Sequence, residues 1–336
     1  MLEPDLPFSA LTPMTTLLVA VALNLLLCSA SRVGAIFSLP NELAGRLITT
    51  LEGRYNTPHA TDAMRRADSI SVAVILMLVG LSAGLGAGYL FEHLPYSWVL
   101  ESMLIAALLS LRPHLERLRF VERAIAQDLN EARATLTLMT GRDAARLDRT
   151  GIAAATIESS AMALPQGFLA PLLWYALGGL PLLFAFKIVD TASAMIDERA
   201  ENARSFGHAP RAISAIFIAP AAAFSGLLAP VAALLLPAAS LRSAFHALTQ
   251  GGRYAWPVFS IPVAAFAGAL STRLGGHVCI GQFERSGDDI GVVKAPPPEP
   301  EILPIARKLF LIAAGLTVLV LAALAAAGIP HPFKLF

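Results

Sequence analysis

Acidic and basic side chains alternate with membrane-grade apolar sequence between Gly141 and Gly207. Those that flank the apolar runs include Arg142, Asp143, Glu158, Lys187 and Asp190. Ionised groups are costly at a bilayer unless they pair or line a wet cavity, so they mark a working site by default. Carboxylates hold Mg²⁺ and arginines bind phosphate oxygens. The stretch therefore predicts a site for anions or Mg²⁺ beside a membrane.

Two further segments carry the same side-chain chemistry. In DERAENARSFG, Asp197 and Glu201 lie four residues apart with Arg204 beside them, which suits Mg²⁺ or an anion if the segment is helical. The alternative is a solvated helix with i,i+4 pairs. Arg273 precedes two glycines in STRLGG, where backbone N–H groups can approach a phosphate. The alternative there is a turn after a helix.

The composition places these residues in a membrane protein. The chain has 336 residues, of which 56% are hydrophobic and 15% charged, and its mean hydropathy is +0.64. A soluble domain of this length is usually more polar. The net charge of +1 gives no electrostatic footprint for nucleic acid.

Apolar runs of about 20 residues can cross the bilayer core. Three such runs are clear, namely Met14 to Ala30, Ile70 to Phe91 and Leu309 to Ala327. Three others are less clear, namely Trp98 to Leu111, Phe168 to Val189 and Ile213 to Leu236. The run from Phe168 to Val189 is interrupted by Gly178, Gly179 and Pro181, and the run from Ile213 to Leu236 contains prolines. Either could be a re-entrant or broken helix, which membranes tolerate where protein or water surrounds the backbone.

Arginines orient the chain, because Lys and Arg accumulate in cytoplasmic loops. Eight arginines and six acids lie between Arg112 and Arg149 in a pattern that reads as helical. The sequence thus predicts an all-α, polytopic helical bundle formed by one membrane domain, 1–336, in the inner membrane. Cytosolic helical segments are expected at about 32–68, 112–166, 190–212 and 238–307, with the site facing the cytosol. A homo-oligomer is also compatible with this architecture.

The remaining motifs give weaker indications of function. GLGAG at Gly84 to Gly88 lies inside an apolar run without a following Lys, so close helix packing explains it better than phosphate binding. The segment ERSGDDIGVVKAPPPEPEILP indicates an extended surface connection. Short-spaced histidine pairs, a P-loop and a nucleophile elbow are absent from the sequence, which argues against a histidine metal cluster and P-loop nucleotide binding.

Several ordered segments together resemble the CobD/CbiB family of cobalamin-biosynthesis membrane proteins. They are VERAIAQDLNEAR, LMTGRDAARLD, IESSAMALPQGFLAPLLWYALGGLPLLFAFKIVDTASAM, RAENARSFG and AGALSTRLGG. The resemblance implies an adenosylcobinamide-phosphate synthase, a carbon–nitrogen ligase. Such an enzyme uses ATP to join aminopropanol phosphate, or free aminopropanol, to a carboxylate of adenosylcobyric acid. Mg²⁺ would accompany the ATP, and the corrinoid would be a substrate.

The chain departs from the family pattern at several polar positions. The motif that begins at Glu158 usually continues with Glu, Asn and Asp where this chain has Met162, Ala163 and Gln166. Asp190 replaces an Asn, and Ser214 replaces an acid. These changes affect the expected reaction more than the fold.

The resemblance and the residue types together assign expected roles. Glu158 and Asp143 handle the metal or act as general base, Lys187 meets transferred charge, and Arg142 and Arg204 bind phosphates; Arg273, Asp190 and Glu201 complete the binding set. Residues 142, 158, 187 and 204 are expected to share one wet pocket at the inner leaflet.

Two other functions stay open. The lost polar groups favour a non-catalytic or regulatory membrane paralogue of the AmpE type. The broken apolar runs alone would fit a small-solute transporter, although no inverted repeat is visible to support one.

Overall fold

The computed structural model describes residues 12–27, 31–57, 59–196, 205–250, 254–276, 278–280, 283–292 and 294–327. These residues form two compact units. Unit 1 contains residues 1–112, 171–217 and 318–336, and unit 2 contains residues 113–170 and 218–317. Each unit is considered by itself.

The helical, polytopic fold class is confirmed. Five helices are long and apolar enough to cross a membrane, namely Asp62–Glu92, Ser97–Gln127, Arg149–Met195, His208–Ala233 and Pro300–Ala326. The third has 47 residues, whereas about 20 suffice to cross a bilayer core, and it contains the break at Gly178 and Gly179. The boundaries between membrane and cytosol along it stay a prediction.

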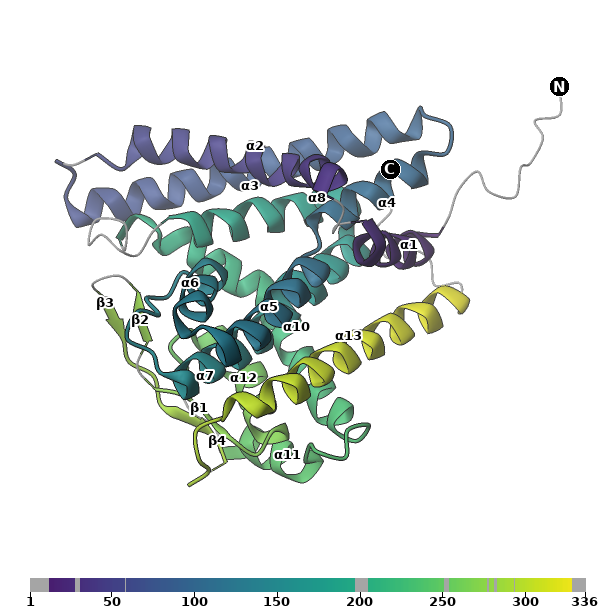
Figure 1. Ribbon diagram of the computed structural model, residues 1–336. Coiled ribbons are helices and arrows are strands. Elements are labelled where there is room, and N and C mark those ends of the chain that lie inside the picture. Colours follow the sequence, from purple (N-terminus) through teal and green to yellow (C-terminus); the bar gives the residue numbers. More distant parts are fainter. Residues whose placement is uncertain are drawn as a thin grey trace. The chain divides into compact units, whose positions relative to one another are not determined.

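Unit 1 is built almost entirely from helices. They are α1 (Pro13–Leu27), α2 (Ser31–Tyr55), α3 (Asp62–Glu92), α4 (Ser97–Leu108), α8 (Ala170–Met195), the first turns of α10 (His208–Ala233) and the end of α13 (Leu303–Ala326). Helices α2, α3 and α8 lie side by side (Figure 1). Their shared core includes Ile48, Leu76 and Val189.

Two glycines allow α3 and α8 to approach closely. A Cβ on Gly80 would lie 2.7 Å from the Cα of Ala185, and one on Gly84 would meet the backbone at Pro181 even more closely. The packing interpretation of GLGAG is confirmed for Gly84. The other two glycines of the motif, Gly86 and Gly88, have no such neighbour within 4 Å.

Helix α8 is broken where the sequence predicted. Gly178 has φ −145° and ψ 22°, and Gly179 has φ 63° and ψ −154°, both outside the helical region. The positive φ of Gly179 is accessible because glycine has no Cβ. Helix α10, in contrast, runs through Pro220 and Pro230 without a break, since losing a few helix hydrogen bonds is tolerated in apolar helices.

Asn24 on α1 secures the end of α4. Its Nδ2 donates to the carbonyls of Ala106 and Leu109, at 2.9 and 3.0 Å, and its Oδ1 accepts from the N–H of Arg112 at 3.1 Å. The chain bends here between α4 and α5, so Asn24 satisfies groups that the break leaves without helix partners. With 15 residues, α1 is shorter than the span predicted for 14–30, so that span is not confirmed over the described residues.

Unit 2 contains helices and short strands. The helices are α5 (Leu111–Gln127), α6 (Leu129–Thr140), α7 (Arg149–Ala163), the π-helix η1 (Leu164–Leu169), most of α10, α11 (Leu241–Gln250), the 3₁₀ turn η2 (Pro257–Phe259), α12 (Ser260–Ala269), the 3₁₀ turn η3 (Pro300–Ile302) and most of α13 (Leu303–Ala326). The strands are β1 (Arg273–Gly275), β2 (Val278–Ile280), β3 (Phe283–Arg285) and β4 (Asp289–Gly291).

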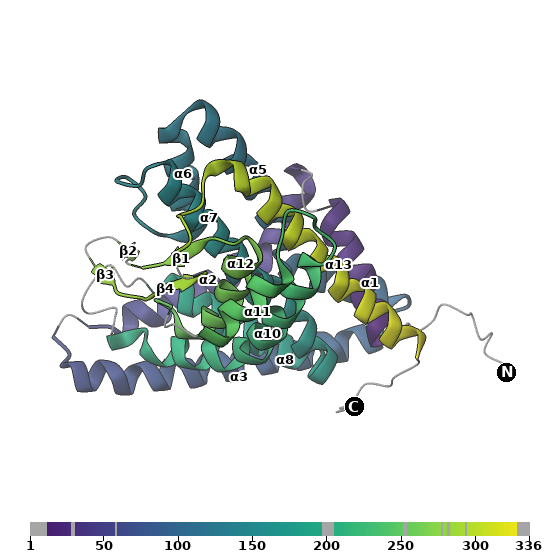
Figure 2. The same cartoon turned by 90° about the horizontal axis from the view of Figure 1, so that it is seen from below.

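Helix α12 is the centre of unit 2. Every residue from Pro262 to Ala269 is buried, and α12 contacts α7, α11, β1 and β4. Figure 2 shows α11 beside α12. The strands form two antiparallel pairs, β1–β4 and β2–β3. Within the expected extended connection, β3 and β4 are strands and residues 295–299 form neither helix nor strand, and pairing satisfies part of the backbone there.

Candidate functional site

Glu158 lies at the centre of a buried polar group in unit 2. Its Oε2 accepts from Arg142 Nη1 at 2.5 Å and from the Tyr254 hydroxyl at 2.7 Å. Its Oε1 accepts from the backbone N–H of Gly275 at 2.8 Å. The residue is only 2% exposed. We call Arg142, Glu158, Tyr254 and Gly275 the Glu158 cluster.

Local signals place the first two members. Helix α6 ends at Gly141, which takes the left-handed conformation with φ 69°, so Arg142 leaves the helix at its C-terminus. Asp148 then begins α7 by accepting from the N–H of Gly151 at 2.8 Å, which is a typical N-cap. Glu158 follows on the buried face of α7.

The other two members come from distant parts of the sequence. The N–H of Tyr254 donates to the hydroxyl of Ser260, at the start of α12, at 3.1 Å. Gly275 ends β1 with φ +92°, and a Cβ there would collide with the carbonyl oxygen of Asp288. Only glycine fits this turn without strain, and the turn aims its N–H at Glu158.

Arg142 is held by three groups. Besides Glu158, it donates from Nη2 to the Tyr254 hydroxyl, and its guanidinium carbon lies 5.1 Å from the ring centroid of Trp256. Burial acts to lower the pKa of the Arg142 guanidinium, but the charge of Glu158 and the bonds to Glu158 and Tyr254 outweigh burial, so the pKa lies above its usual value. Arg142 is therefore a permanent buried cation.

Tyr254 remains a neutral phenol. Burial, as the largest cause, and the charge of Glu158 raise its pKa well above the usual value, while Arg142 acts in the opposite direction. A neutral hydroxyl can donate to Glu158 and accept from Arg142 at once. The geometry shows both bonds.

The remaining predicted residues of unit 2 lie at its surface. Asp143 is exposed, and its Oδ1 accepts from the N–H of Ala145 at 3.0 Å. Arg273 pairs with Asp289 at 3.2 Å, with side chains 46% and 58% exposed. An exposed pair of this kind contributes little to stability, which leaves the Arg273 guanidinium accessible to an anion.

Lys187 and Asp190 belong to unit 1. On α8, Lys187 Nζ lies 3.9 Å from Asp190 Oδ2, and the hydroxyl of Ser214 donates to Asp190 Oδ1 at 3.1 Å. Both charged side chains are largely buried. Glu201 and Arg204 lie in 197–204, outside the described residues. The expected common pocket of residues 142, 158, 187 and 204 therefore stays a prediction, although Arg142 and Glu158 are in contact.

Sequence reasoning missed Tyr254 and Trp256. Both lie in GGRYAWP, a polar segment to which no sequence motif assigns a role. Tyr254 is 96 residues from Glu158 along the chain, so no local spacing connects them. Their aromatic side chains in a polar segment were the one available signal.

The carboxylates differ in how well they suit a metal. No group of three or more His, Cys, Asp or Glu side chains gathers among the residues that the structure describes. Glu158 already accepts three hydrogen bonds, one from a cation, and that cation would repel Mg²⁺. Asp143 is exposed and fits better, because Mg²⁺ on a nucleotide needs only one or two carboxylates.

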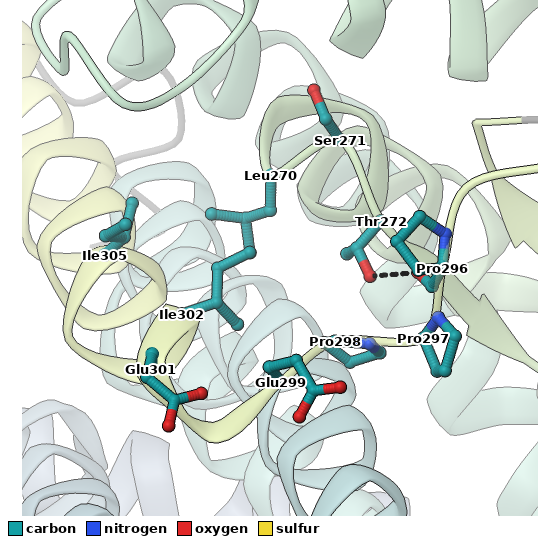
Figure 3. A pocket seen from close by; sticks show the side chains of 10 residues that line it. All are labelled: Leu270, Ser271, Thr272, Pro296, Pro297, Pro298, Glu299, Glu301, Ile302 and Ile305. Carbon is teal, nitrogen blue, oxygen red and sulfur yellow. Dashed lines mark hydrogen bonds between the residues drawn. The ribbon is translucent and has the colours of Figure 1, made fainter.

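A shallow hollow of about 340 Å³ also lies in unit 2. Figure 3 shows its lining by residues 270–272, which follow α12, by the proline segment 296–298, by η3 and by the start of α13. Glu299 and Glu301 lie at its rim, and Thr272 bonds the carbonyl of Pro296 at 3.1 Å. None of the predicted site residues that the structure describes lines it.

Comparison with known proteins gives a consistent answer. The family model described as CobD/Cbib protein matches residues 17–310. A Sinorhizobium protein named cobalamin biosynthesis protein CobD is 33% identical over 240 residues, which cover 69% of this chain and 73% of that protein. Proteins of the same name from Brucella suis and Geobacter metallireducens are 30% and 32% identical, covering 71% and 69% of this chain and 74% and 73% of theirs.

No solved structure matches the chain. The family match nevertheless covers most of its length, including every member of the Glu158 cluster. The chain belongs to the CobD/Cbib protein family.

Proposed function

We propose that this protein acts in cobalamin biosynthesis as an ATP-dependent amide synthase. It would join aminopropanol phosphate, or free aminopropanol, to adenosylcobyric acid and so form adenosylcobinamide phosphate or adenosylcobinamide. The family membership supports the pathway. The observation that carries the site is the buried contact of Arg142 with Glu158, completed by Tyr254 and Gly275.

The chemistry explains why fixed charges are needed. A carboxylate at neutral pH does not react with an amine until one of its oxygens becomes a leaving group. ATP does this by transferring a phosphoryl group to the carboxylate, after which the amine attacks the acyl carbon and phosphate leaves. The protein mainly positions the reactants and stabilises charge.

The residues can be given roles on that basis. Arg142 and Arg273 bind phosphate oxygens, together with Arg204 of the segment outside the described residues. Asp143 contributes a ligand to Mg²⁺, which would neutralise phosphate charge. Lys187 stabilises the negative charge that is transferred in the reaction, with Asp190 as its ion-pair partner.

Glu158 needs a revised role. Its carboxylate already accepts from three donors, which makes it a poor metal ligand and a poor acceptor for a further proton. We therefore propose that Glu158 orients Arg142, whereas a base for the amine comes from elsewhere in the site. The site would face the cytosol from the inner membrane, where the arginines of 112–149 are expected.

The decisive assay uses purified protein with adenosylcobyric acid, aminopropanol phosphate and Mg-ATP. Release of ADP, together with a corrinoid product heavier by the added amine, is the expected result. In that assay Arg142→Ala should abolish most of the product. Unaltered product formation by Arg142→Ala and by Glu158→Gln would remove both residues from the reaction.

A second candidate is a non-catalytic membrane paralogue. The observation that favours it is the contact of the Tyr254 hydroxyl with the sulfur of Met162, at 3.7 Å, beside Arg142 and Glu158. Methionine stands there in place of an expected carboxylate. Stable expression without restored growth of a synthase-null strain on cobyric acid would favour this candidate, and restored growth would exclude it.

A further inference from the structure

We infer that Tyr254 is a positioning residue that keeps the Arg142 guanidinium available to a phosphate ligand by preventing its bidentate pairing with Glu158. This inference rests on the proposed function for the identity of the phosphate-bearing substrate. Its geometric basis is independent of that function. No motif in the sequence assigns Tyr254 a role.

The first step concerns how arginine and carboxylate normally pair. A guanidinium and a carboxylate tend to form two parallel N–H···O bonds, which give a strong and rigid pair. Here only Nη1 donates to Glu158, at 2.5 Å, while Nη2 donates to the Tyr254 hydroxyl. The phenol thus occupies the place that the second carboxylate bond would take.

The second step concerns the carboxylate. Oε1 of Glu158 is turned toward the N–H of Gly275 at 2.8 Å, and Oε2 accepts from Tyr254 at 2.7 Å as well as from Arg142. An ionised carboxylate has about four acceptor positions. Three are used, so Glu158 cannot readily turn to meet both ends of the guanidinium.

The third step concerns what remains on Arg142. A guanidinium has five N–H donors, and the hydrogen bonds to Glu158 and Tyr254 use two of them among the described residues. Trp256 lies against one part of the guanidinium, 5.1 Å from its carbon. The aromatic ring thereby stabilises the cation without consuming a donor. Arg142 is held in place and still has donors for an anion.

Removal of one hydroxyl tests this arrangement. In Tyr254→Phe the ring can still pack against Trp256, but Arg142 is free to form two bonds with Glu158. We expect the KM for one phosphate-bearing substrate, Mg-ATP or aminopropanol phosphate, to rise about tenfold, the size of one net hydrogen bond to a charged group. The KM for free aminopropanol and kcat should change less than twofold.

The matched control is Tyr175→Phe in unit 1. Tyr175 is also buried, 3% exposed, and its hydroxyl donates to Glu101 at 2.8 Å, so the same chemical group is lost from the same kind of bond. We expect no phosphate-specific change in KM from this control. An equal change in both variants would overturn the inference, since it would report a general loss of buried hydroxyl bonds.

A double-mutant cycle separates positioning from a purely structural role. If Tyr254 acts through Arg142, adding Tyr254→Phe to Arg142→Ala should leave the residual KM values unchanged. A further tenfold rise in that background, or a fall confined to kcat, would overturn the inference.

A binding measurement keeps the inference testable even if the synthase reaction is absent. Replacing Trp98 and Trp174 by Phe leaves Trp256 as the sole tryptophan, with the Arg142 guanidinium against its ring. Sodium pyrophosphate should then change its emission, with half-saturation about tenfold higher after Tyr254→Phe. Absence of any change, or equal half-saturation in both proteins, would refute positioning. Lack of product with this binding signal intact would refute only the proposed reaction.

Discussion

Neutralising Glu158 should destabilise unit 2 substantially. Both oxygens of the carboxylate accept hydrogen bonds, Oε2 from Arg142 and Tyr254 and Oε1 from Gly275. Glutamine offers one oxygen and one NH₂ group, so the NH₂ must face a donor in either orientation. The variant Glu158→Gln therefore loses a charge partner for Arg142 and leaves at least one buried donor unsatisfied.

The magnitude follows from these two losses. Removing one partner of a buried ion pair costs about 3–5 kcal/mol, and the remaining oxygen can still accept one hydrogen bond. We expect about 3 kcal/mol, at the lower end of that range. For a unit of this size each kcal/mol shifts the melting temperature by about 2–4 °C, which gives a decrease of about 6–12 °C.

The assay is thermal denaturation. The detergent-purified protein is heated in steps at pH 7, and the fraction that remains monodisperse is measured after each step. The control Glu131→Gln changes an exposed carboxylate of α6 and should alter stability by no more than about 0.5 kcal/mol. The double variant Arg142→Gln with Glu158→Gln should be more stable than Glu158→Gln alone, because no unpaired buried charge remains. A melting temperature of Glu158→Gln within 2 °C of the wild type would refute the description of Glu158 as a buried, charge-paired hub.

Three further changes test the fold around the site. Gly275→Ala should lower stability by about 2 kcal/mol or more, because φ is +92° and the added methyl group meets a backbone carbonyl. The control Gly315→Ala should not lower stability, since its methyl group meets nothing within 4 Å. Equal melting temperatures of the two variants would contradict the turn geometry. Gly84→Ala should separate α3 from α8 and lower the free energy of unfolding by about 1–3 kcal/mol. The control Gly86→Ala faces open space and should leave stability unchanged. Identical melting curves for the two variants would contradict the helix contact. Asp148→Asn should keep the N-cap but remove its titration. A backbone N–H bond at the start of α7 lowers the pKa of Asp148, so the charged carboxylate adds to the stability of the wild type above about pH 4. This added stability disappears as the pH falls through the lowered pKa. Melting temperatures of wild type and Asp148→Asn from pH 7 to pH 3 should therefore converge at the acid end, and a constant difference would contradict the assignment.

The sequence alone determined the helical membrane fold and several local features. Long apolar runs need no tertiary information, because their length and composition already match the bilayer. The break at Gly178 and Gly179 and the packing of Gly84 were also predictable. Because glycine lacks a Cβ, it permits a positive φ, as at Gly179, or a close helix contact, as at Gly84. Arg142 and Glu158 were identifiable as candidate site residues because ionised groups beside apolar sequence are costly unless they pair.

Only the tertiary structure decided what those charges contact. Tyr254 and Gly275 follow Glu158 by 96 and 117 residues, and no periodicity links positions so far apart. Their meeting depends on the burial of α12 and the turn after β1, which in turn depend on packing throughout unit 2. Hydrogen bonds act over about 3 Å, so which donor reaches a carboxylate is fixed by folded geometry and not by residue type.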